Sequence, residues 1–177
     1  MDSVALLKGQ SELAFQEIVE ACAGLSEGKS WAAPPQTGSD YLHTDGSILG
    51  VVLHVASAKF IYGSCAFRDN EIRWRDCADR IDRFEPSWTG ALDYLHESHR
   101  YWLETWGDLL SSDLEAERPN FRGQLLPSWK IIRVMIHHDS YHAGQIAVLR
   151  YALVETDKPP ISYAADIREF CRDLPSW

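Results

Sequence analysis

The chain has 177 residues, enough for one domain with a buried core, and its 45% hydrophobic content is typical of a globular protein. The formal net charge of −9 argues against a nucleic-acid partner and against binding to an anionic membrane surface, because both attract basic proteins. We expect no membrane span and no secretion signal, since no apolar run stands out as long enough and the start Met1-Asp2-Ser3 lacks the charged and apolar signal pattern. These features predict a cytoplasmic protein with a single domain, residues 1–177.

The cysteines show no C-x-x-C spacing, which excludes a zinc ribbon and a thioredoxin-type motif. Free and mostly buried thiols are therefore expected. The four cysteines are Cys22, Cys65, Cys77 and Cys171.

Hydrophobic residues recur at helical spacing in four long segments, and there are few strand signals. The predicted helices span residues 3–25, 47–67, 86–110 and 128–154, with Ser47 and Ser128 as expected N-caps. Loops are expected at 31–47 and 112–127, where proline and glycine interrupt the pattern. The arginine-rich segment 68–83 is expected to form a short helix and a loop on a salt-bridged surface, and residues 163–172 a short closing helix.

Four amphipathic helices joined by fairly long loops predict an all-α fold, a four-helix bundle. Binding sites in such bundles are built in the core from side chains on facing helices. The core-facing polar residues are therefore the ones to examine for function.

The fourth predicted helix carries two histidines, His138 and His142, four positions apart. At about 100° per residue they lie roughly 40° from each other, on the stripe that also carries Ile131 and Leu149. Two imidazoles one turn apart on a core-facing surface can bind one metal ion. Pairs at this spacing also arise by chance, so the pair alone does not establish a site.

His54 falls in the middle of the second predicted helix, on an apolar face with small residues beside it. A lone histidine on such a face is usually a core residue whose nitrogens are hydrogen-bonded. Three histidines on the core-facing stripes of two helices are harder to explain by packing, because burying several imidazoles is costly and a shared metal removes that cost.

The other histidines have weaker claims. His99 lies within the apolar stripe of the third helix and is expected to be a core group or to support a ligand, while His96 lies three residues away and could also supply one. His137 is about 100° from His138 and should face outward. His43 lies in a loop, where nothing constrains it.

Other side chains could contribute to a site at the histidine pair. Gln145 projects beside His138 and His142 and could orient a ligand or a bound molecule, so it is a weak candidate for a catalytic positioning role. Asp139 is expected to project off the histidine stripe, which leaves no carboxylate near the pair to act as a general base. Trp31, Trp102 and Trp106 could line an apolar pocket, although core packing explains each of them as well.

The run His138-Asp139-Ser140-Tyr141-His142-Ala143-Gly144-Gln145-Ile146, together with His54 in Leu49-Gly50-Val51-Val52-Leu53-His54, resembles the DinB-like superfamily, which includes bacillithiol- and mycothiol-dependent S-transferases. The resemblance covers most of the chain through Leu153, and H-x-x-x-H-x-G-Q-I is its most specific part. It implies a bundle of up-down-down-up order with a long crossover. It also implies a divalent metal ion, often zinc or nickel, held by His54, His138 and His142, and frequent homodimers.

Three histidines with an open fourth position are typical of a catalytic metal site. The preferred hypothesis is therefore a metal-dependent, S-transferase-like enzyme that activates a small thiol, a low-molecular-weight cosubstrate, for transfer to an electrophile. The alternatives are a metal-dependent hydrolase, a non-enzymatic stress-related metal or ligand binder, and a bundle whose histidines only pack. The expected partner is a small-molecule substrate.

Overall fold

The computed structural model describes residues 2–33 and 46–153. Four long helices dominate this part: α1 (Ser3–Cys22), α3 (Ile48–Phe67), α5 (Trp88–Trp106) and α6 (Ser128–Leu153). Shorter elements connect them: α2 (Glu27–Trp31), α4 (Trp74–Ile81), the 3-10 turn η1 (Ser111–Glu115), β1 (Glu117–Pro119) and β2 (Leu125–Pro127). The predicted all-α bundle is confirmed.

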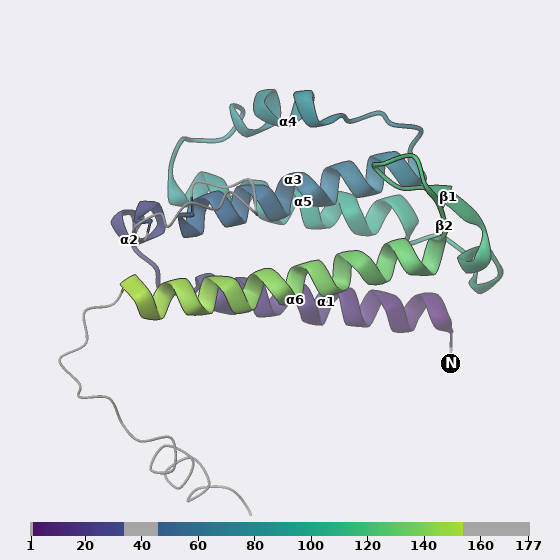
Figure 1. The fold of residues 1–177 in the computed structure, drawn as a ribbon, viewed down its shortest axis with the longest axis horizontal. Coiled ribbons are helices and arrows are strands. Elements are labelled where there is room, and N and C mark those ends of the chain that lie inside the picture. The colour runs from purple at the N-terminus through teal and green to yellow at the C-terminus, as the bar shows by residue number, and fades with distance from the viewer. Residues whose placement is uncertain (1, 34–45, 154–177) are drawn as a thin grey trace, which may run out of the picture.

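The long helices form two layers, α1 beside α6 and α3 beside α5 (Figure 1). Helices α1 and α6 run in one direction, and α3 and α5 run in the other (Figure 1). Because α3 and α5 are parallel, the chain must return along the bundle between them, and the segment that carries α4 makes this crossover. Helix α3 also packs on α6, so it faces both its own layer and the opposite one.

Side-chain caps fix where the helices begin. Asp2 accepts a hydrogen bond from the Val4 amide at the start of α1, and Ser47 accepts one from the Gly50 amide at the start of α3. Ser87 does the same for Gly90 in α5. A Cβ at Gly90 would lie 1.9 Å from the Glu85 carbonyl oxygen, so this first turn of α5 requires glycine.

The predicted cap at Ser128 is wrong. Ser128 is the first residue of α6, and its hydroxyl donates to the Ala116 carbonyl and accepts from Arg118 Nε. These bonds tie the start of α6 to the short hairpin that precedes it. The same serine that looked like a cap therefore anchors the helix to a neighbouring element.

Two apolar clusters fill the bundle. One lies where the first halves of α3 and α5 pack on α1 and the second half of α6, and Ile18, Val52, Leu95 and Ile146 belong to it. The other joins the opposite ends of the same helices. Its fully buried members include Trp102, Trp106, Ile131, Ile132 and Met135.

The sequence prediction missed small elements and misplaced some ends. The helix α2 and the hairpin β1–β2 fall in or beside segments expected to be loops, and α5 ends at Trp106 rather than near residue 110. Three-residue strands carry too little alternation to be recognised. The closing helix expected at 163–172 lies outside the described residues, and whether residues 1–177 form one domain stays a prediction.

The expectation that no segment is long and apolar enough to cross a membrane was also wrong for α3. Its length and composition pass that test, with a mean hydropathy of 1.5, but 78% of the apolar window is buried inside the bundle. Burial of this kind is what a core helix shows, because a helix that is apolar on all sides must be covered on all sides.

Candidate metal centre

Three imidazoles meet where α3 crosses α6. His54 comes from the first half of α3, and His138 and His142 come from the middle of α6, one turn apart. Both helices are continuous through these positions, so the side chains project from rigid backbone. The nearby Val51, Val55 and Ile146 are fully buried and hold the two helix faces together.

The ring nitrogens of these histidines converge. One nitrogen from each ring lies within 4.8 Å of one from each of the others. The Nε2 atoms of His138 and His54 are 3.3 Å apart, and the ring centroids of His54 and His142 are 5.0 Å apart. The sequence placed these residues on two core-facing stripes, and the structure brings all three to a common point.

The site lies at the edge of the core. His142 is buried, whereas His54 and His138 are half-buried, so the group can be reached from one side. Burial lowers the pKa of His138 to about 2 and that of His142 to about 4, and the neighbouring imidazoles disfavour added charge further. Both rings are therefore neutral near pH 7, and neutral imidazole is the form that binds a metal ion.

Gln145 sets the tautomer of His142. Its Oε1 lies 2.8 Å from His142 Nδ1, and because a carboxamide oxygen only accepts, Nδ1 carries the proton. The lone pair of His142 is then on Nε2. Orientation of a ligand histidine by a hydrogen bond to its other ring nitrogen is general in metal sites.

The Nδ1 atom of His138 is buried and has no hydrogen-bond partner within residues 2–33 and 46–153. It is not the nitrogen closest to His54, because His138 Nε2 lies 3.3 Å from His54 Nε2. In the same part of the chain, no fourth histidine, cysteine or carboxylate joins the three imidazoles. Three imidazole nitrogen donors, one of them held in a fixed tautomer, fit a divalent transition metal such as zinc.

The remaining histidines lie elsewhere. His99 is buried on α5, stacked on Phe15 with ring centroids 3.8 Å apart, and it does not join the three imidazoles. His96 and His137 are exposed, the latter as predicted from the helical wheel. His43 lies outside the described residues.

The arginine-rich segment 68–83 forms a salt-bridged surface around α4, as expected. Arg80 contacts Glu97 at 3.8 Å and lies over the Phe60 ring, and Arg68 donates to the Glu104 carbonyl. The tryptophans divide: Trp102 and Trp106 are buried in the core, while Trp31 is exposed and lines a separate pocket of about 300 Å³.

The prediction that no carboxylate lies on the inward face near the histidine pair was wrong for Asp139. Its side chain is fully buried and forms an ion pair with Lys59 of α3, which is also fully buried. Helix α6 packs against both α1 and α3, so its inward arc is wider than the histidine stripe and includes Asp139. Lys59 was missed altogether, although a single charged residue within the apolar α3 is a signal that could have revealed it.

These observations define an all-helical bundle with a candidate three-histidine metal centre. The model of the DinB family matches residues 43–153, which is more than half of the chain and includes all three histidines. The chain belongs to the DinB family. No curated protein matches the chain.

Proposed function

We propose that this protein is a metal-dependent enzyme that activates a small thiol for transfer to an electrophile, with the ion held by His54, His138 and His142. The convergence of three ring nitrogens within 4.8 Å supports this more than any other observation. Membership of the DinB family agrees with it.

The residues of the chain have distinct roles in this proposal. The three imidazoles would donate lone pairs to the ion, and Gln145 holds the ring of His142 in the required tautomer. A divalent ion, zinc or nickel, would supply the positive charge that lowers the pKa of a thiol so that it reacts as thiolate near pH 7. With three protein ligands, one position remains for the sulfur of the cosubstrate.

A metal-dependent hydrolase would use the same histidines but would gain from a carboxylate as general base. Asp139 is the only buried carboxylate among the described residues, and Lys59 occupies one of its oxygens. Asp139 is fully buried in this ion pair, so it cannot exchange protons with solvent as a general base must. Thiol transfer, which needs no such base, is therefore the better proposal.

We also propose a cytoplasmic location, a small-molecule substrate and a homodimeric state. The net charge of −9 supports the absence of a nucleic-acid or anionic membrane partner. Light scattering coupled to size-exclusion chromatography tests the dimer, and a mass equal to one chain would contradict it.

The metal is tested by elemental analysis of the purified protein beside the His54→Ala and His138→Ala variants. We expect about one zinc or nickel ion per chain in the wild type and little in either variant. His137→Ala is the matched control, because His137 is an exposed histidine on the same helix and should leave the metal content unchanged. A wild type free of bound metal, and unable to take up zinc, would overturn the proposal.

The reaction is tested by following the loss of free thiol when the protein is given a panel of low-molecular-weight thiols and a generic electrophile. We expect metal-dependent consumption that stops when a chelator is added and is absent in His142→Ala. Metal binding without turnover across the panel would favour a metal or ligand binder. Hydrolysis of an activated ester with no thiol present would favour the hydrolase.

A further inference from the structure

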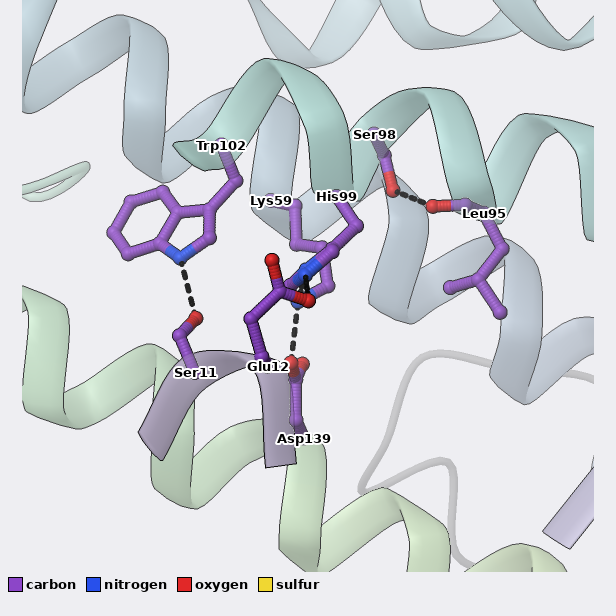
Figure 2. A network of polar contacts seen from close by, with 8 residues as sticks. All are labelled: Ser11, Glu12, Lys59, Leu95, Ser98, His99, Trp102 and Asp139. Carbon is purple, nitrogen blue, oxygen red and sulfur yellow. Dashed lines mark hydrogen bonds and ion pairs between the residues drawn. The ribbon is translucent and has the colours of Figure 1, made fainter. Parts of the chain in front are cut away.

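A second polar group lies in the core beside the three histidines, and it joins all four long helices (Figure 2). Lys59 of α3 forms an ion pair with Asp139 of α6, and its Nζ lies 3.4 Å from His99 Nδ1 of α5. His99 Nε2 in turn lies 3.1 Å from a carboxylate oxygen of Glu12 on α1. We call these four residues the Lys59 cluster.

The Lys59 cluster is closed to solvent at its centre. Lys59 and Asp139 are each 0% exposed, and His99 is 5% exposed, whereas Glu12 is exposed at the surface end. Burial lowers the pKa of Lys59 and raises that of Asp139, and each partner opposes the shift of the other. Two buried charges persist only where they meet each other, so the ion pair fixes the relative position of α3 and α6.

The Lys59 cluster and the metal centre share backbone. Asp139 directly follows His138 and precedes His142 by three residues, so it lies between the two α6 ligands in sequence. Lys59 is five residues beyond His54 on α3, about 7.5 Å along the helix axis. A shift or rotation of α6 that separated Asp139 from Lys59 would therefore move both histidines away from His54.

Apolar packing alone does not set this register sharply. The clusters that join α3 and α6 are apolar, and hydrophobic attraction has no direction. An ion pair between buried side chains is directional and has a single partner. Metal ligands must be held within about 0.5 Å of the productive geometry, which requires such a constraint.

We infer that Lys59 and Asp139 are positioning residues, which hold α3 and α6 in the register that brings His54 to His138 and His142. His99 and Glu12 support Lys59 from the opposite side and join α5 and α1 to the same constraint. The function of this register, to assemble a metal site, rests on the proposed function. The register itself, and the meeting of the three histidines, does not depend on a bound metal.

The decisive variant is Lys59→Met/Asp139→Leu, which removes both charges and keeps similar volume, so that no unpaired charge is left in the core. We expect it to fold but to bind zinc about 10- to 100-fold more weakly than the wild type. With Co²⁺ in place of zinc, the absorption bands that report ligand geometry should shift. Wild-type affinity together with a wild-type cobalt spectrum would overturn the inference.

The matched control is Ser11→Ala. Ser11 accepts a buried hydrogen bond from Trp102 Nε1 at 3.2 Å, which joins α1 to α5 but does not join α3 to α6 (Figure 2). We expect its zinc affinity and cobalt spectrum to match the wild type. A loss equal to that of the double variant would mean that any softened core weakens the site, and this would also overturn the inference.

A readout without metal separates this inference from the proposed function. In the metal-free wild type, nuclear Overhauser contacts should join the rings of His54 and His138, whose centroids are 5.3 Å apart, and the double variant should lose them. If the wild type binds no zinc but shows these contacts, and the double variant lacks them, the proposed function fails and the positioning role stands. If the contacts persist in the double variant, the positioning role fails.

Should the double variant not fold, amide hydrogen exchange of the metal-free wild type decides the matter. If the ion pair holds the register, the amides of residues 55–59 and 139–143 should be protected as strongly as that of the core residue Ile132 without zinc, and zinc should raise the protection of all of them by a similar factor. Protection that appears only on adding zinc would show that the metal draws the helices together, and would overturn the inference.

Discussion

The core of this bundle holds two polar groups, the Lys59 cluster and the three histidines. They differ in how their polar atoms are paired. The Lys59 cluster balances charge inside itself, through the ion pair to Asp139 and the contacts to His99 and Glu12. The three histidines instead bring one ring nitrogen each to within 4.8 Å of the others, and no carboxylate joins them in the described part of the chain. Buried charges that meet each other serve the fold, whereas converging imidazole nitrogens can bind a metal ion.

The largest effect is expected from removing the partner of one charge in the Lys59 cluster. Asp139→Leu strands a buried ammonium, and we expect the free energy of unfolding to fall by about 3 to 5 kcal/mol. Urea denaturation of the metal-free protein measures it. Adding Lys59→Met to this variant should restore much of the loss, and a double variant as unstable as the single one would show that the charge is not the cause.

Removing one histidine of the metal centre should weaken zinc binding strongly and change the free energy of unfolding little. We expect His142→Ala to weaken zinc binding on the order of 100- to 1,000-fold, since structural zinc contributes roughly 3 to 4 kcal/mol per ligand. Competition with a chromophoric chelator measures the affinity. The free energy of unfolding of the metal-free variant should change much less than that of Asp139→Leu, and a larger change would mean that the histidines are structural.

Lowering the pH should decrease the free energy of unfolding through the buried histidines. The pKa of His99 is lowered from 6.5 to about 3 by burial and by the Lys59 charge. Between these pH values His99 therefore binds a proton in the unfolded chain but not in the folded one. Stability from this residue is complete above pH 6.5 and falls by about 1.4 kcal/mol per pH unit as the pH drops toward 3. His99→Phe should remove this part of the slope, measured by urea unfolding of metal-free protein from pH 7 to 4.5.

The control for that measurement is Phe15→Leu, which alters the ring stacked on His99 without removing a proton site. It should lower stability by a similar amount at every pH and keep the wild-type slope. A His99→Phe slope equal to that of the wild type would mean that His99 is not held neutral by burial.

The smallest expected effect concerns Gln145. Gln145→Leu removes the hydrogen bond that fixes the tautomer of His142, and we expect zinc affinity to fall about tenfold with little change in metal-free stability. Gln145→Glu should keep the acceptor and restore most of the affinity. If Gln145→Leu binds zinc as tightly as the wild type, the His142 ring needs no such support.

Helical periodicity was sufficient to predict the bundle and to place His54, His138 and His142 on core-facing stripes. That one ion would join all three was implied by the resemblance to the DinB-like superfamily. Periodicity was not sufficient for Asp139, since a wheel centred on the histidine stripe does not show that α6 is covered by two helices. The hairpin β1–β2 was missed because three-residue strands have almost no period. The bond between Ser128 and the Ala116 carbonyl depends on tertiary contact, which no local pattern reports.

Helix α3 has one charged residue in its 20, Lys59, and it lies near the middle. While the ribosome is still extending the chain, before α6 exists to offer Asp139, this helix is an apolar segment of spanning length. A lysine near the centre of such a segment raises the free energy of translocon-mediated insertion by about 2.5 to 3.5 kcal/mol. We therefore expect the side chain that later joins two helices also to disfavour insertion of the nascent segment, and an insertion assay of residues 48–67 with and without Lys59→Met would measure this effect.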